Sequence, residues 1–351
     1  MPIPNISKYQ ENAIHDLLNI LGYPHARGTL NRDFLTNPGM KKVIAYIEFY
    51  GLHRNVKKKT MEVSNDAFCS SLATKGNLYV VRFDNRDIGL SSYYDHLGAP
   101  NLLRSILKKT FCFCCGPPSS PYSLSDMADD VFGLMDHLSI SKAHLAGASM
   151  GGMIAQTCAI DRPERVLSLC SIMSTTGQSF LPRADSSLLG VIFAKPKKGS
   201  TREETAENLH KHFHKILKAL MNPVPPEDTL AQYIETTVKR SYHPEGGARQ
   251  LAAILNQVDR RPELGKLKMP CLVVHGRGDR LVKWQHGTAT AKAIGQRCNT
   301  LFIDFMGHSL PRQHFGVIVD AIVANVARAE DVDVDADADA VGVDDLHVKM
   351  D

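Results

Sequence analysis

The run Gly147-Ala148-Ser149-Met150-Gly151 places a serine between two glycines, each two positions away. An apolar run, 144–148, precedes Ser149, and a run compatible with a helix, 153–160, follows it. A serine at the apex of such a strand–turn–helix lies in strained backbone, so its glycine neighbours let strand and helix approach. The pattern predicts an exposed hydroxyl beside a helix N-terminus, whose free N–H groups suit an oxygen that becomes negative during a reaction.

A serine hydroxyl becomes a good nucleophile when a histidine takes its proton and a carboxylate orients that histidine. In open α/β sheets such groups gather beyond the C-terminal ends of strands. Asp279 follows the apolar run 270–275, and His308 follows the run 300–305. Asp304 is a competing acid, but it falls within its apolar run. We therefore predict that Ser149, Asp279 and His308 meet at three neighbouring strand ends.

The elements that must position these residues follow an alternating pattern. Strand-like and helix-like runs alternate from about 78 to 173 and again after 266, which predicts a parallel sheet with helical crossovers. The stretch between them has helical spacing and several prolines. We divide the chain into a poorly defined N-terminal segment, a two-part core, an inserted helical cap and an acidic disordered tail: residues 1–40, 41–173 with 266–328, 174–265, and 329–351.

The sequence resembles the α/β-hydrolase superfamily over about residues 63–328, most closely the branch of aclacinomycin methylesterase and the proline-iminopeptidase-like hydrolases. The likeness is strongest in the blocks 80–91, 122–171 and 241–311. It implies an α/β-hydrolase fold, with a mostly parallel central sheet flanked by helices and an inserted helical cap. It also implies that Ser149 is the nucleophile, His308 the base and Asp279 the orienting acid. Two residues of the first block, Asp84 and Arg86, match a loop that is structural in the family.

The same resemblance implies an oxyanion hole made of two backbone N–H groups. One belongs to Met150, directly after the serine, and the family places the other just after an early strand. The nearest match for the second is Leu52 in Tyr50-Gly51-Leu52, where Tyr50 replaces the usual first residue and Glu48 interrupts the strand pattern. These departures keep open a catalytically weakened homologue that binds a ligand without turnover.

We expect a cofactor-independent carboxylesterase or methylesterase that acts on a small-molecule ester through an acyl-enzyme. An alternative is an iminopeptidase-like amidase, which would recognise a free amine through carboxylates of the predicted cap, for which Glu203, Glu204 and Glu235 are available. No metal site is expected. His210 and His214 share a helix face with no evident third ligand, and the nearby Lys211 and Lys215 indicate a solvated surface.

Composition narrows the partners and the compartment. The net charge of +4 includes an acidic end, since eight aspartates and one lysine give residues 331–351 a charge of −7. The remaining basic residues are scattered without a nucleic-acid motif, so no nucleic-acid partner is expected. No apolar run reaches the roughly 18 residues of a membrane span, and Met1 to Lys8 lacks the features of a secretory signal, so we expect a cytoplasmic protein.

The chain has eight cysteines, whose spread indicates no disulfide framework. Three of them cluster in Cys112–Cys115 without a matching metal-ligand pair, and the role of this cluster stays open. The identity of the ester and the oligomeric state are not determined by these patterns.

Overall fold

The computed structural model describes residues 42–47, 65–102, 120–192, 194, 196–240 and 243–338. Six strands of this part form one sheet in the order β2-β1-β3-β4-β5-β6, and every neighbouring pair is parallel. The expected parallel sheet is therefore confirmed. The strands are β1 (Lys42–Ile47), β2 (Leu78–Phe83), β3 (Ala143–Ala148), β4 (Val166–Ile172), β5 (Cys271–Gly276) and β6 (Cys298–Ile303).

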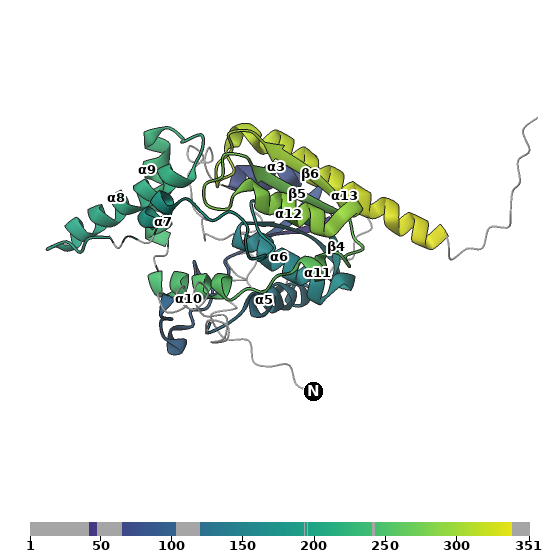
Figure 1. The fold of residues 1–351 in the computed structure, drawn as a ribbon, viewed down its shortest axis with the longest axis horizontal. Coiled ribbons are helices and arrows are strands. Elements are labelled where there is room, and N and C mark those ends of the chain that lie inside the picture. The colour runs from purple at the N-terminus through teal and green to yellow at the C-terminus, as the bar shows by residue number, and fades with distance from the viewer. Residues whose placement is uncertain are drawn as a thin grey trace, which may run out of the picture.

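Helices cover both faces of this sheet (Figure 1). One face packs against a group that shares a core around Leu145 and Ile154, and the other packs against a pair that contributes Phe68 and Phe315. The first group comprises α5 (Leu124–His137), α6 (Met150–Asp161), α11 (Arg261–Leu264) and α12 (Trp284–Ile294), and the pair is α3 (Asn65–Lys75) and α13 (Phe315–Ala338). Short 3-10 turns lie at η2 (Asp95–Leu97), η3 (Pro163–Arg165), η4 (Gly295–Arg297) and η5 (Arg312–His314).

Helix α5 illustrates how local sequence sets an element of the core. Ser123 accepts a hydrogen bond from the Asp126 N–H, and the Asp126 carboxylate accepts one from the Ser123 N–H, which together form a capping box. Residues at helical spacing, including Val131 and Met135, are buried in the core that α5 shares with α6 and the sheet. The cap fixes where the helix begins, and the apolar stripe fixes which face meets the core.

The stretch between β4 and β5 is helical, and its described residues contain no strand. In Figure 1, α7, α8 and α9 stand to one side of the sheet, while α10 lies near α5. The helices are α7 (Ser186–Ile192), which the sequence pattern did not predict, α8 (Arg202–Leu220), α9 (Glu227–Arg240) and α10 (Pro244–Leu255). The arrangement fits the expected inserted cap, and its role over the site stays a prediction.

The core does not end at residue 328, where the sequence pattern predicts its boundary. Helix α13 continues to Ala338, so residues 329–338 are helical rather than part of a disordered tail. Ala329 is buried in the core, and Glu330 forms an ion pair with Lys42 of β1. Extending a helix that has already formed needs no new nucleus, so a composition that could not fold alone can lengthen an existing helix. Residues 339–351 lie outside the described residues, as do residues 1–40.

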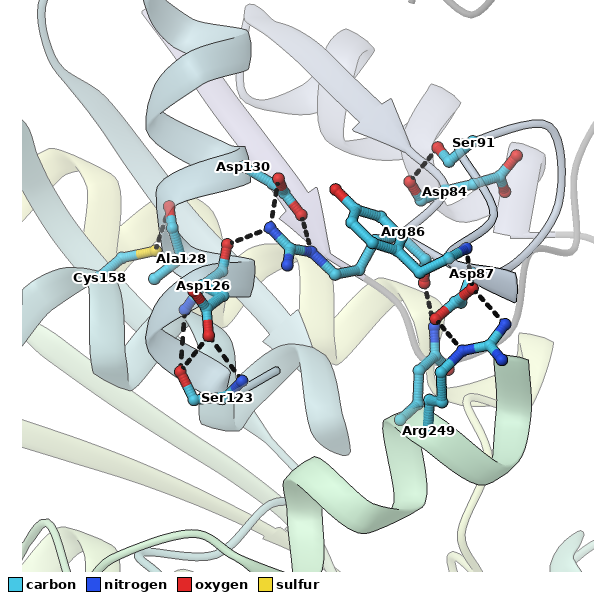
Figure 2. A network of polar contacts seen from close by, with 12 residues as sticks. Asp84, Arg86, Asp87, Ser91, Ser123, Asp126, Ala128, Asp130, Cys158 and Arg249 are labelled. Carbon is cyan, nitrogen blue, oxygen red and sulfur yellow. Dashed lines mark hydrogen bonds and ion pairs between the residues drawn. The ribbon is translucent and has the colours of Figure 1, made fainter. Parts of the chain in front are cut away.

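Two neighbouring residues after β2 fasten the loop there to separate helices (Figure 2). Arg86 makes a bidentate contact with Asp130 of α5, with nitrogen–oxygen distances of 2.6 and 2.8 Å. Asp87 points the other way and receives two hydrogen bonds from Arg249 of α10, at 2.7 and 2.8 Å. The Asp87 and Arg249 side chains are 0% and 1% exposed, so this ion pair is fully removed from water. The loop thus joins α10 to the sheet.

Replacing Arg249 with methionine is expected to destabilise the protein by about 3–5 kcal/mol, because it leaves the Asp87 carboxylate buried without its cation. The measurement is the free energy of unfolding in urea. Lys75→Met is the matched control, since the Lys75–Asp320 pair is 51% and 63% exposed and such pairs contribute about 0–1 kcal/mol. Equal losses in the two variants would contradict this account of the buried pair.

Candidate active site

Ser149 lies at the turn between β3 and α6 in a backbone conformation that few residues adopt. Its φ of 56° and ψ of −118° fall outside the usual regions for a residue with a side chain. Surrounding hydrogen bonds hold this conformation. The Ser149 N–H donates to the Ile172 carbonyl at 2.9 Å, and the Ser149 carbonyl accepts from the Ser174 hydroxyl at 2.7 Å. The strained turn predicted from the sequence is present, fixed from the neighbouring strand β4.

Glycines permit the close approach that this turn requires. A Cβ atom on Gly147 would lie 2.1 Å from the Gly151 carbonyl oxygen, and one on Gly152 would lie 2.6 Å from the Ser174 Cβ. Both contacts are shorter than real Cβ atoms tolerate. The steric requirement predicted at Gly147 is therefore confirmed. The requirement at Gly152 comes from the neighbouring segment after β4, which the motif alone could not indicate.

The structure brings Ser149, His308 and Asp279 into one hydrogen-bonded chain. The His308 Nε2 atom lies 2.9 Å from the Ser149 hydroxyl oxygen, and His308 Nδ1 lies 2.7 Å from Asp279 Oδ2. The second oxygen of Asp279 accepts the backbone N–H groups of Leu281 and Val282 at 2.8 and 2.9 Å. Because a carboxylate only accepts, His308 Nδ1 carries the hydrogen and Nε2 is left to accept from the serine.

The Asp279 carboxylate is fully buried yet surrounded by donors. Burial opposes its ionisation, but the charge of His308 and hydrogen bonds from His275 and His308 outweigh that effect. The pKa of Asp279 therefore lies well below its ordinary value. At neutral pH the aspartate is an anion next to His308, which suits it to hold an imidazole in one orientation and to stabilise its protonated form.

The loop that carries His308 is held by backbone contacts from the helical insertion. The His308 N–H donates to the Leu220 carbonyl at the end of α8 at 2.8 Å, and the Gly307 N–H donates to the Asn222 carbonyl at 2.9 Å. A Cβ atom on Gly307 would lie 2.6 Å from the Leu220 oxygen. Gly307 thus permits the segment after α8 to pack directly on the histidine loop. Backbone bonds between such distant segments leave no sequence signal.

The competing acid Asp304 is not part of this arrangement. Strand β6 ends at Ile303, so Asp304 follows the strand instead of lying within it as the apolar pattern indicated. Its side chain is 73% exposed and pairs with Arg277. Asp304 lies on the surface, whereas Asp279 is buried against His308. Burial and contact with His308, rather than position relative to the strand, therefore favour Asp279 as the orienting acid.

The described residues offer one group of acids and histidines close enough to hold a metal: Asp87, Asp95 and His243. Arg249 already lies between the two carboxylates, 2.7 Å from Asp87 and 2.9 Å from Asp95, so a cation of the chain itself occupies this group. The histidine-rich face of α8 is engaged differently. His214 contacts Glu227 of α9, which ties two helices of the insertion together.

The expected second oxyanion donor, Leu52, lies outside the described residues, as does the Cys112–Cys115 cluster. Strand β1 ends at Ile47, which pairs with Gly147 two residues before Ser149. The strand order also reverses between β1 and β3, the place where open α/β sheets bind ligands.

Among the described residues, no helix has both the length and the apolar character needed to span a membrane.

This combination of parallel sheet, strained serine turn and helical insertion has known relatives. The family described as the alpha/beta hydrolase fold matches residues 111–310. The chain belongs to this family. It is also similar in structure to a meta-cleavage product hydrolase, CumD, from Pseudomonas fluorescens, with a TM-score of 0.58, 16% identity and coverage of 83% of this chain and 92% of that chain. That likeness supports the fold.

Similar sequences include two kinds of hydrolase. Rhodomycin D methylesterase DnrP of Streptomyces peucetius is 23% identical over 75% of this chain and 86% of its own length. A 2-hydroxy-6-oxononadienedioate/2-hydroxy-6-oxononatrienedioate hydrolase of Paraburkholderia xenovorans is 29% identical over 50% of this chain. The alignment spans 66% of the Paraburkholderia protein, slightly less than two thirds of its length.

Gly147→Ala is expected to destabilise the protein by about 3 kcal/mol or more, because the added methyl group meets the Gly151 carbonyl. Gly133→Ala is the matched control. Gly133 lies within α5 with open space around its Cα, so alanine there should stabilise by up to about 1 kcal/mol. Denaturant unfolding of both variants tests the opposite signs, and a neutral Gly147→Ala would contradict the steric account of the turn.

Asp279→Asn is expected to reduce stability by an amount that depends on pH. Because the folded-state pKa of Asp279 is lowered, its ionised form contributes stability that is present above the unfolded value of about 3.9 and is lost as the pH falls toward the folded value. The gap in unfolding free energy between the parent protein and the variant should therefore narrow from pH 5 to pH 3. A gap that stays constant over this range would refute the assigned shift.

Proposed function

We propose that this protein is a serine hydrolase that cleaves a carboxylic ester of a small molecule through an acyl-enzyme. The observation that carries the proposal is the chain from the Ser149 hydroxyl through His308 to the buried Asp279, with distances of 2.9 and 2.7 Å. Membership of the alpha/beta hydrolase fold family supports it, because that fold presents its nucleophile on this kind of turn.

In the proposed reaction, the Ser149 oxygen attacks the ester carbonyl while His308 Nε2 takes the serine proton. Asp279 keeps the other imidazole nitrogen protonated and stabilises the cation that forms. His308 then gives the proton to the departing alcohol, which leaves the acyl group on Ser149. A water molecule, activated by the same imidazole, releases the carboxylic acid. In the first half of the cycle His308 thus passes the serine proton to the alcohol, and in the second half it passes a proton from water to the Ser149 oxygen, which restores the hydroxyl.

Negative charge on the carbonyl oxygen needs donors that are already in place. Met150 is the first residue of α6, and N–H groups in the first turn of a helix have no acceptor within that helix. We assign the Met150 N–H as one oxyanion donor and the Leu52 N–H as the second. Losing one donor of this kind costs on the order of a hundredfold to a thousandfold in rate. The helix N-terminus adds favourable potential at the same place.

The preference for an ester rests on the comparisons and on the insertion. The methylesterase relative aligns with 75% of this chain, a longer stretch than the Paraburkholderia hydrolase does. An amidase of the iminopeptidase kind would need a carboxylate free to bind an amine. Of the acids available, Glu204 accepts a hydrogen bond from the Ser200 N–H and so stabilises the start of α8. That contact engages one of the three carboxylates that the amidase alternative could use.

Ser149→Ala is expected to abolish labelling by a fluorophosphonate probe and to lower kcat for short acyl esters by a factor on the order of 10⁴ to 10⁶, because no other group supplies the nucleophile. His308→Ala should lower kcat to a similar extent. The matched control is His314→Ala, which removes a partly exposed histidine six residues away that contacts Gln313. Methyl, ethyl and para-nitrophenyl esters provide the substrates.

Two outcomes would overturn this proposal. Labelling that survives Ser149→Ala would exclude Ser149 as the nucleophile. Thermal stabilisation by an ester that is never hydrolysed would favour the ligand-binding homologue instead. A further substrate is a 2-hydroxy-6-oxo-dienoate like those named for the Paraburkholderia relative. Comparing its kcat/KM with those of the esters tests whether the enzyme prefers a substrate other than a simple ester.

A further inference from the structure

His275 is a buried histidine that the proposed reaction does not use. It lies near the C-terminal end of β5 and is 0% exposed. Its Nε2 atom lies 2.8 Å from the Val282 carbonyl and 3.6 Å from Asp279 Oδ2. A carbonyl can only accept, so Nε2 carries the hydrogen. The bond from His275 to Val282 therefore closes the base of the turn that carries Asp279.

The opposite side of the imidazole is fixed by packing. A Cβ atom on Gly287 of α12 would lie 2.6 Å from His275 Nδ1, so the helix backbone rests directly on the ring. Within the described part of the chain, Nδ1 has no hydrogen-bond partner. Because Nδ1 forms no hydrogen bond here, the polar contacts of the His275 ring are those made by its Nε2–H group.

Val282 links His275 to the carboxylate. The Val282 carbonyl accepts from His275, and the N–H of the same residue donates to Asp279 Oδ1 at 2.9 Å. The other carboxylate oxygen, Oδ2, receives the His308 Nδ1–H at 2.7 Å and faces the His275 N–H. Removing the His275 ring would release Val282 and remove a positive dipole beside Oδ2. Either change would let the carboxylate rotate away from His308.

We propose that His275 is a positioning residue that holds the Asp279 carboxylate in the orientation required by His308. This inference rests on the proposed function, because Asp279 acts there through His308. His275 contacts neither Ser149 nor any reacting atom in the proposed reaction. It fixes the turn of residues 276–282 from beneath, and the effect reaches the serine only through Asp279 and His308.

The test compares His275→Leu with a conservative variant and a matched control. His275→Leu removes the donor, while His275→Gln keeps an N–H at nearly the same distance from the backbone. The control is His144→Leu. His144 is a buried histidine of β3 that is 2% exposed and bonds Ser168, so its loss reports the cost of emptying a buried histidine site away from Asp279.

His275→Leu is expected to lower kcat and the rate of fluorophosphonate labelling by about tenfold to a hundredfold, with KM unchanged. A loss of this size is typical when a residue that positions a catalytic group is removed. His275→Gln should recover most of this loss, and His144→Leu should stay within about twofold of the parent. The second readout is the downfield proton NMR resonance of the His308 N–H bound to Asp279. It should shift upfield or broaden in His275→Leu and persist in the other two variants.

Equal labelling rates and an unchanged resonance in His275→Leu would overturn the inference. If His275→Leu fails to fold, as judged by circular dichroism, His275→Asn serves instead, since its shorter side chain cannot reach the Val282 carbonyl. Failure of the proposed function is distinguishable, because the parent protein itself would then resist labelling. The resonance would still report whether His275 holds Asp279 against His308.

Discussion

The buried charge of Asp279 is the constraint on which the candidate site depends. A carboxylate with a fully buried side chain must be matched by donors, and this one faces two backbone N–H groups and two imidazoles. Those donors come from the turn itself, from strand β5 and from the loop after β6. Stabilising the anion therefore requires these segments to meet in one arrangement, and that arrangement directs the His308 imidazole toward Ser149.

A second constraint acts at the other end of the hydrogen-bonded chain. Ser149 has a positive φ that costs on the order of 1–3 kcal/mol and persists only where neighbouring structure holds it. Here the hydrogen bonds to Ile172 and from Ser174 come from β4 and the segment after it. In this conformation Ser149 lies just past the C-terminal end of β3, at the N-terminus of α6. The two constraints meet at His308, which bonds both Ser149 and Asp279.

The helical insertion takes part in this geometry through its backbone. Leu220 and Asn222, at the end of α8, accept the N–H groups of His308 and Gly307. At the other end of the insertion, Arg249 of α10 binds Asp87 after β2, and Figure 2 shows Arg86 turned from the same loop toward Asp130 of α5. The insertion is thus bonded both to the histidine loop and to the loop after β2. A change in the packing of α8 would therefore shift the position of the His308 imidazole.

The sequence by itself determined what is local. The glycines around Ser149 indicate a close approach between nearby residues, and alternation of apolar runs with turn residues predicted a parallel sheet and most helices. Strand-end placement, together with the family resemblance, also selected Asp279 and His308, because parallel strands end at one edge of a sheet. Helix α7 and the extension of α13 to Ala338 were missed, and the extension continues a helix that has already formed, which needs no new nucleus.

Only the tertiary structure decided which distant groups hold the site. In the sequence Gly307 is an ordinary loop glycine, but in the structure the backbone of Leu220 packs directly against it. In the sequence His275 is a strand-end residue, but in the structure its N–H lies beside Val282 and Asp279. The pairing of Asp87 with Arg249 joins residues 162 positions apart. Backbone hydrogen bonds and buried ion pairs of this kind depend on distance and direction in the folded chain, and residue type at one position does not encode them.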